Sequence, residues 1–235
     1  TNTVAVANSL KIKCNTILMN TTYPTTVNIA TPVANVTNGL GIDANSANAN
    51  ATAATQPRLV NVISGVATLE TSGGKVAVRF VRASSTRLTV ADTTANINNM
   101  SSYFVGQYVT TAGNHVGYAL STTNRFYLPT SNGTSIFAGY AGTANAILLQ
   151  PVNINRNLYE LLAPSPNNSS VVESFANGVS KGTVAISSGA SVAIWLGHAN
   201  NVNFYDGEIQ EVIGWQSNAN RANIESNINT YWTIY

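Results

Sequence analysis

FYDGEIQEVIGW (204–215), followed at once by QSNANRANIESNINTYW (216–232), joins a strand pattern to a helix pattern. Successive side chains of a strand point to opposite faces, so the first stretch is predicted to divide into two sets. One set is Ile209, Glu211 and Ile213, and the other is Glu208, Gln210 and Val212. This alternation predicts a half-buried strand.

The second stretch predicts a short helix. Ser217 and Asn218 are residue types that cap helix N-termini, and apolar residues then follow at helical spacing up to Tyr231. Arg221 and Glu225 are four positions apart, so they are expected to form an ion pair on the exposed side of this helix. The sequence therefore predicts a strand that leads directly into a closing helix.

The rest of the chain shows short runs of alternating apolar residues between polar turns, a pattern typical of β-sandwiches and jelly rolls. The predicted strands are 10–14, 58–64, 75–82, 87–91, 102–110, 115–121, 125–128, 135–140, 145–152, 170–176, 182–186 and 192–197. Gly73-Gly74 and Asn177-Gly178 are predicted to form tight hairpin turns. Residues 44–60 have low complexity and are predicted to form a long surface loop.

The Gly-x-Ile-x-Glu strand at Gly207, Ile209 and Glu211, together with the closing helix, resembles the C-terminal signature of concanavalin-A-like, laminin-G-like jelly rolls. Such domains are found in phage structural proteins and in secreted bacterial surface proteins. SFANGVSKGT (174–183) resembles a hairpin common in laminin-G-like domains. GGKVAVRFVRASSTRLTV (73–90) resembles a strand region of the phage members.

This resemblance covers roughly residues 45–235. It implies an all-β fold, a two-sheet antiparallel jelly-roll sandwich (concanavalin A-like) with a short C-terminal α-helix. We therefore expect residues 1–235 to form a single domain. Residues 1–44 match the pattern poorly, and two interpretations stay open for them. They are either additional strands of the same sandwich or an N-terminal arm that docks on a neighbouring subunit.

The composition restricts the function classes. Charged residues make up 9% of the chain, compared with roughly a quarter in typical soluble domains. The 11 basic and 9 acidic residues are scattered without a basic run, so no nucleic-acid partner is expected. No apolar run approaches the roughly 20 residues that span a bilayer, so no membrane insertion is expected. A neutral surface rich in Asn, Thr, Ser and Gly favours a virion surface or extracellular location.

The acidic residues offer no matched catalytic pair. A retaining glycosidase requires two carboxylates about 5–5.5 Å apart, and the laminarinase-like pattern that supplies them on this fold is missing. Asp206 and Glu208 are the nearest candidates, because residues two apart share a strand face, while Glu211 is expected on the opposite face. We therefore predict no catalytic residue and no enzymatic activity, and a glycosidase stays as an alternative.

No metal site and no cofactor are predicted. His115 and His198 have no acidic residue at ligand spacing, so a structural or surface role is expected for each. Calcium stays open as a ligand, because several relatives bind it through loop carboxylates and carbonyls. Asp43, Asp92 and Asp206 lie in loop-like contexts that would suit it.

Aromatic rings offer a platform for sugar rings, while amide and carboxylate groups can bind the hydroxyls. Two tyrosines that flank one polar loop are predicted to be exposed, and polar residues complete the set. The predicted glycan-binding residues are Tyr127, Tyr140, Asn132, Asp206 and Glu208. The tryptophans lie in strand or helix patterns and are predicted to be core residues. They are Trp195, Trp215 and Trp232.

The leading interpretation is a non-enzymatic structural or surface protein of a virion, such as a tail fibre, spike or head decoration, with a lectin-like fold. It would serve assembly and bind glycans or host surfaces weakly. Copies of itself and other virion or surface proteins are the expected partners, and a homo-oligomer is expected because one shallow glycan site is weak. Two alternatives stay open: a secreted bacterial adhesin or carbohydrate-binding module, and a glycoside hydrolase of the same fold.

Overall fold

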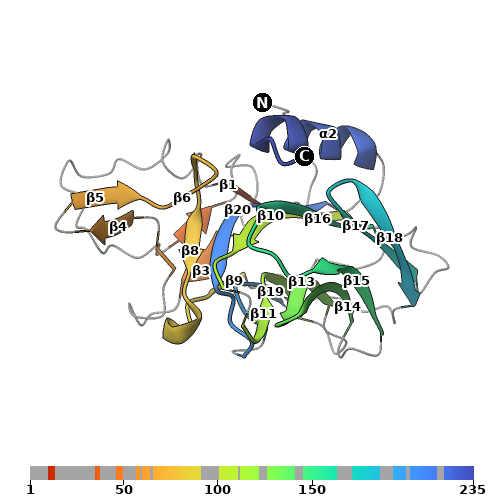
Figure 1. The fold of residues 1–235 in the computed structure, drawn as a ribbon, viewed down its shortest axis with the longest axis horizontal. Helices are drawn as coiled ribbons and strands as arrows, with labels where there is room; N and C mark the ends of the chain where they lie inside the picture. The colour runs from red at the N-terminus through yellow and green to blue at the C-terminus, as the bar shows by residue number, and fades with distance from the viewer. Residues whose placement is uncertain are drawn as a thin grey trace.

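The computed structural model describes residues 10–13, 35–37, 46–49, 57–58, 60–63, 66–90, 101–110, 112–121, 126–140, 145–162, 171–185, 193–199, 202–215 and 220–235. In these ranges two layers of antiparallel strands lie face to face, and the helix α2 (Arg221–Trp232) covers the outer face of one layer (Figure 1). Two packed antiparallel sheets with a short C-terminal helix form a jelly-roll sandwich, which confirms the predicted fold class.

The first sheet contains, in the described part of the chain, seven strands in the order β1-β20-β10-β16-β17-β18, with β8 also paired to β20. Their bounds are β1 Leu10–Lys13, β8 Val78–Phe80, β10 Ser101–Tyr108, β16 Asn157–Leu162, β17 Val171–Ala176, β18 Val179–Ala185 and β20 Gly207–Trp215. β10 lies on one side of β20, while β1 and β8 pair with different halves of its other side. The strand that the C-terminal signature predicts therefore lies inside this sheet.

The second sheet contains nine strands among the residues described, in the order β15-β14-β13-β12-β19-β9-β3-β2, with β11 also paired to β13. Their bounds are β2 Asn35–Thr37, β3 Ser46–Ala49, β9 Leu88–Val90, β11 Asn114–Val116, β12 Tyr118–Ser121, β13 Phe126–Asn132, β14 Ser135–Tyr140, β15 Asn145–Pro151 and β19 Ala193–Leu196. Two separate hairpins join β4 Val60–Ile63 to β5 Val66–Leu69 and β6 Thr71–Ser72 to β7 Lys75–Val76.

Every strand that the sequence predicts overlaps an observed strand. The two tight turns are confirmed as well, because both residues of Gly73-Gly74 and of Asn177-Gly178 have positive φ angles. The prediction of a long loop over residues 44–60 is wrong in part, since β3 lies within it. β16 is among the observed strands that the sequence does not predict. Five consecutive residues of this strand are buried, so it has no polar–apolar alternation to reveal it.

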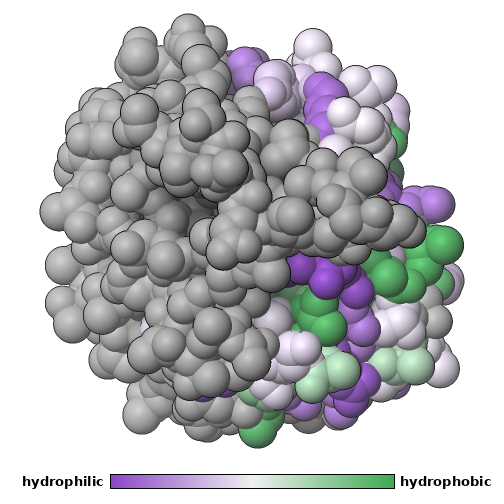
Figure 2. All heavy atoms as spheres, turned by 90° about the vertical axis from the view of Figure 1, so that its left-hand side faces the viewer, coloured by the Kyte–Doolittle hydropathy of each residue, from purple (hydrophilic) through white to green (hydrophobic). Residues whose placement is uncertain are grey.

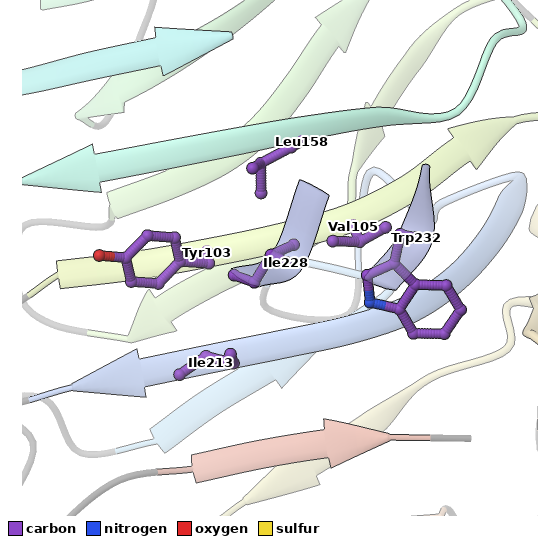
Figure 3. Packing of buried hydrophobic residues seen from close by; sticks show 6 residues of the cluster. All are labelled: Tyr103, Val105, Leu158, Ile213, Ile228 and Trp232. Carbon is purple, nitrogen blue, oxygen red and sulfur yellow. The ribbon is translucent and has the colours of Figure 1, made fainter. Parts of the chain in front are cut away.

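Helix α2 packs on the outer face of the seven-stranded sheet. Ile228 and Trp232 from the helix lie against Tyr103 and Val105 of β10, and Figure 3 shows their side chains directed at the strands. Leu158 and Ile213 complete the same buried cluster from β16 and β20. Trp232 also donates its indole N–H to Glu211 Oε2 at 2.6 Å. The predicted core role of Trp232 is confirmed, and the outer face of β20 is a buried surface.

β20 departs from strict alternation at one position. Val105 of β10 lies opposite Glu211, but the next residue, Gly106, lies opposite Ile209. Gln210 therefore has no partner on β10, and this β-bulge shifts the alternation by one residue. The prediction that Ile209 and Glu211 share a face is wrong for this reason.

The bulge also changes where the acidic residues of β20 lie. Glu208 is opposite Gln107, which shares the helix side of the sheet with Val105. Glu208 and Glu211 consequently lie on the same face, whereas the sequence predicts opposite faces. Ile209 and Val212 face the interior of the sandwich, and both are almost completely buried.

Arg221 holds the first turn of α2 to the sheet. Its guanidinium lies 3.0 Å from buried Glu160 of β16 and 2.6 Å from Glu225, four residues along the helix. The guanidinium carbon also lies 3.4 Å from the centroid of the Phe175 ring. The predicted Arg221–Glu225 pair is confirmed, but it faces the sheet and not the solvent.

The cap of this helix is Asn220, which has positive φ and makes no side-chain capping bond. Ser217 and Asn218, the predicted caps, precede it and lie outside the described residues. Figure 2 shows the side of the molecule that lies on the left in Figure 1; on its coloured surface, hydrophilic and hydrophobic residues are interspersed.

Candidate functional site

Asp206 and Glu208, the acidic part of the predicted site, meet an arginine at the edge of the seven-stranded sheet. Arg79 of β8 lies opposite Glu208 in the register, and its Nη2 donates to Asp206 Oδ1 at 2.5 Å. Glu208 is 8% exposed. Burial raises the pKa of the Glu208 carboxyl, and the nearby Arg79 guanidinium opposes that rise. The two carboxylates are thus parts of a half-buried ion-pair cluster that joins β8 to β20.

This cluster continues toward a second ion pair. Arg58 Nε donates to Glu70 Oε1 at 2.5 Å, and both residues act on the Glu208 carboxyl electrostatically. The ion-pair cluster lies next to the β6–β7 hairpin, where Gln210 donates to the Ser72 carbonyl at 2.8 Å. This position fits a structural role, in which the cluster holds the hairpin on the sheet. A sugar that bound here would have to displace these internal contacts.

Asn132 stands at the end of the β13–β14 hairpin. It is exposed, but its Oδ1 accepts hydrogen bonds from the Thr134 and Ser135 backbone N–H groups and from the Thr134 hydroxyl, all at 3.0–3.1 Å. The side-chain carbonyl therefore closes the turn. Tyr140 pairs with Phe126 in the register of the same hairpin, and its side chain lies outside what the structure describes.

Tyr127 is partly exposed and lies on the outer face of the nine-stranded sheet. Its neighbour across the strands is Ala119, and the next residue in the same line is Trp195. Ala119 is completely buried, because it packs with the rings of Tyr127 and Trp195 in one cluster. The face is the outer one, since the adjacent Tyr118 directs its hydroxyl inward, toward Gly214 of the other sheet. Two rings thus flank one small residue.

The cluster extends past Trp195. The His198 ring lies 5.6 Å from the Trp195 ring and 6.3 Å from the Phe204 ring, which stacks on it. His198 is buried and shares a hydrogen bond of 3.2 Å with the Thr89 hydroxyl. Burial lowers the pKa of His198 to about 4, and the Arg87 guanidinium adds to this effect. We call Tyr127, Trp195, His198 and Phe204 the aromatic strip.

The predicted glycan-binding residues do not form one site. Tyr127 lies on the outer face of the nine-stranded sheet, whereas Glu208 lies on the outer face of the seven-stranded sheet. The full thickness of the sandwich therefore separates them. Of the predicted set, the structure brings together Asp206 and Glu208, and it places Tyr127 with residues that the sequence analysis did not select.

Trp195 is the main residue that sequence reasoning assigned wrongly. It stands next to buried Leu196 in a strand with an alternating apolar sequence, yet it is partly exposed. Alternation separates the side chains of a strand into two faces, but it does not show which face is exposed to solvent. The signal that would have identified it is the pairing of β19 with β12, which depends on the order of strands in the sheet.

A second surface lies on helix α2. Asn223, Ser226, Asn227, Thr230 and Tyr231 line a shallow depression on its outward side. Tyr231 is 41% exposed, but Lys75 Nζ lies 4.4 Å from the centroid of its ring. One face of this ring is consequently already in contact with an ammonium group.

The described residues contain no group of three or more His, Cys, Asp and Glu side chains that could hold a metal ion. Asp206 faces the Arg79 guanidinium, and Asp43 and Asp92 lie outside those residues. Within the same ranges, no helix is both long enough and apolar enough to cross a membrane.

No protein-family model matches the chain, and a sequence comparison with curated proteins finds no match. Among solved structures, the receptor-binding domain of botulinum neurotoxin type G is similar with a TM-score of 0.51 and 11% identity. The similarity covers 77% of this chain and 48% of that structure. The fold is a lectin-like jelly roll.

Two carbohydrate-binding domains show weaker similarity. The CBM40 domain of the Ruminococcus gnavus IT-sialidase, solved with α2,3-sialyllactose, has a TM-score of 0.42 and 10% identity over 55% of this chain and 82% of that one. Domain 4 of the arabinanase AbnA from Geobacillus stearothermophilus, solved with arabinotriose, has a TM-score of 0.46 and 10% identity over 66% and 77%.

Proposed function

We propose that this chain is a non-enzymatic surface module that binds glycans through the aromatic strip. The observation that supports this most is the position of Trp195 and Tyr127 on either side of Ala119, with both rings partly exposed on one sheet face. Aromatic rings present a rigid apolar surface on which the C–H face of a sugar ring can pack. The strands beneath hold both rings at a fixed spacing, so little conformational entropy is lost on binding.

The polar groups beside the rings suit hydroxyl recognition. Thr89 is partly exposed and pairs in the register with Trp195, so its hydroxyl lies next to that ring. Arg87 is partly exposed two residues earlier on the chain. An apolar platform with a few polar groups at its border is the usual arrangement of a small-molecule site.

The test is a glycan array probed with the wild-type protein, Trp195→Ala and Tyr231→Ala, followed by titration with the best ligand. We expect Trp195→Ala to weaken binding at least about tenfold, because such rings dominate binding energy where they are central. Tyr231→Ala, which removes a ring from helix α2 on the other side of the sandwich, should bind as the wild type does. Thermal unfolding of all three proteins shows whether each variant is folded.

Other outcomes would place the binding site elsewhere or contradict glycan binding. Loss of binding in Tyr231→Ala alone would transfer the site to the depression on α2. A wild-type protein that binds nothing on the array would contradict glycan binding and would favour an architectural role. Running the array with calcium and again with EDTA tests the calcium hypothesis, and we expect no difference.

A glycosidase finds little support in Asp206 and Glu208. Asp206 is engaged with Arg79, and the Glu208 carboxyl is mostly buried in the same cluster. The double variant Asp206→Asn, Glu208→Gln should therefore leave glycan binding unchanged. Hydrolysis of an oligosaccharide by the wild type that disappears in this variant would establish the enzymatic alternative.

We further propose that the module acts on a virion surface, in a tail fibre, spike or head decoration, as a subunit of a homo-oligomer. The support is the charge-poor composition, with 9% charged residues in the chain, which allows copies to pack without mutual repulsion. A secreted bacterial adhesin would have the same low charge content for the same reason. Purification of virions or of culture supernatant from the native source, followed by mass spectrometry, distinguishes the two locations.

A further inference from the structure

We propose that the aromatic strip selects glycans carrying a carboxylate-bearing sugar, with the Arg87 guanidinium as the group that binds the carboxylate. This inference rests on the proposed function, because it adds a charge requirement to the same surface.

The partners of the arginines single out Arg87. Among the described arginines, three pair with carboxylates: Arg58, Arg79 and Arg221. Two others donate to backbone carbonyls at distances of 2.8–3.2 Å: Arg82 and Arg156. Arg87 makes a marginal bond, from Nη1 to the Ser85 carbonyl at 3.4 Å. Its donors therefore remain largely available for a ligand.

The position of Arg87 places this charge at one end of the strip. Arg87 directly precedes β9, in which Leu88 is buried opposite Leu196 and Thr89 lies opposite Trp195 on the outer face. If the extended backbone continues by one residue, Arg87 shares the face of Thr89. Its guanidinium carbon lies 5.9 Å from the centroid of the Phe204 ring. Arg87 is thus adjacent to the rings and remains partly exposed.

The chemistry of the group favours a carboxylate. The guanidinium is planar and always charged, and its parallel N–H bonds match the two oxygens of a carboxylate. Next to an aromatic ring, water is partly excluded and such a pair is stronger than in bulk solvent. A sugar ring seated on Trp195 with its carboxylate toward Arg87 would use both features together.

The experiment measures affinity for two carboxylate ligands, trigalacturonate and sialyllactose, and for neutral lactose and sulfated lactose. The proteins are the wild type, Arg87→Gln, Arg87→Lys, Trp195→Ala and the control Lys181→Gln. Lys181 is exposed on β18 of the other sheet, so its variant removes one positive charge away from the strip. Thermal unfolding confirms that each variant is folded.

We expect the wild type to bind at least one carboxylate ligand about tenfold or more tightly than lactose, as a charged hydrogen-bonded pair provides. Arg87→Gln should lose this preference while its affinity for lactose stays unchanged, and Arg87→Lys should keep part of it. Lys181→Gln should behave as the wild type does. Whether trigalacturonate or sialyllactose is preferred identifies the kind of acidic sugar.

Several outcomes would overturn this inference without contradicting the proposed function. A preference that persists in Arg87→Gln, or an equal gain with sulfated lactose, would exclude carboxylate recognition by Arg87. Equal wild-type affinity for lactose and the acidic ligands would do the same while the proposed function stands, provided that Trp195→Ala loses binding. A wild type that binds none of the four ligands would overturn the inference, while the glycan array decides the proposed function separately.

Discussion

Glu160 shows how a single buried carboxyl connects the sheet to the helix. Its side chain is almost inaccessible, and burial raises its pKa to about 7, with Arg221 opposing this rise. A carboxyl whose pKa is higher in the folded state stabilises the fold below its unfolded value near 4.5, and this stability is lost as the pH rises through 7. The relevant window therefore lies between these two values.

We expect Glu160→Gln to remove this dependence, since a neutral amide can still accept a hydrogen bond from Arg221 Nη2. In urea titrations, the stability of the variant relative to the wild type should therefore increase as the pH is raised from 5 to 8. Glu173→Gln, on the neighbouring strand β17, serves as the control. Parallel pH profiles of wild type and Glu160→Gln would exclude this role of Glu160.

His198 predicts the opposite pH dependence. Its folded-state pKa is lowered from 6.5 to about 4, so the folded protein resists protonation there. The contribution to stability is complete above 6.5 and is lost as the pH falls toward 4. We expect the melting temperature of the wild type to fall more steeply over this range than that of His198→Gln. An equally steep fall in both proteins would contradict the assignment.

At this scale, the residue types of the site were easier to anticipate than their positions. An aromatic platform follows from the chemistry of sugars, and Tyr127 belongs to the predicted set. Trp195 and Arg87 could not be selected, because they join Tyr127 through the pairing of β9, β19, β12 and β13. These strands come from three separate parts of the chain, and no local pattern encodes their order.

At the scale of elements, Trp232 connects α2 to the sheet through both an apolar contact and a hydrogen bond. We expect Trp232→Ala to lower the unfolding free energy by about 3–5 kcal/mol, because it removes a ring from the cluster against β10. Trp232→Phe keeps much of the apolar contact but leaves Glu211 without the indole N–H, at a cost of about 1–3 kcal/mol. Denaturant titrations measure both values. Equal losses in the two variants would show that the contact area is not the main contribution.

The N-terminal segment supplies another test, since β1 pairs with β20 from Leu10↔Gly214 to Lys13↔Glu211. Deletion of residues 1–44 would remove β1 and leave this edge of β20 without its partner. We expect the truncated protein to unfold at lower urea concentration and with a smaller m value than the full chain. This outcome would support a single domain that includes these residues. Unchanged values for both would favour a separate arm.

The elements themselves were largely predictable because turns and alternation are local. The dipeptides Gly73-Gly74 and Asn177-Gly178 both form tight turns with positive φ angles. The C-terminal strand–helix combination resembles that of the jelly-roll fold that the structure shows. The bulge at Gln210 was not predictable, since nothing in GEIQEV distinguishes a regular strand from one that skips a partner. That one inserted residue moves Glu208 from the predicted face of the sheet to the face that carries Glu211.

For the whole molecule, the proposed function predicts weak binding by one copy and strong binding by many. A partly exposed strip on a sheet face buries little of a ligand, while linked copies raise the effective concentration of further sites. We expect binding to a dense glycan surface to exceed the solution affinity for the same free glycan by about 10²–10⁴-fold. Sedimentation velocity identifies the oligomer responsible. A monomer with equal affinity in both formats would contradict this expectation.

The line Trp195–Ala119–Tyr127 also sets a length. These residues lie on β19, β12 and β13, and neighbouring strands are about 4.8 Å apart, so the two aromatic residues sit roughly 10 Å apart across the sheet. A ligand that contacts both rings must lie across the strands and must be longer than one sugar. The spacing of three hydrogen-bonded strands therefore sets the minimum length of an oligosaccharide that can contact both rings at once.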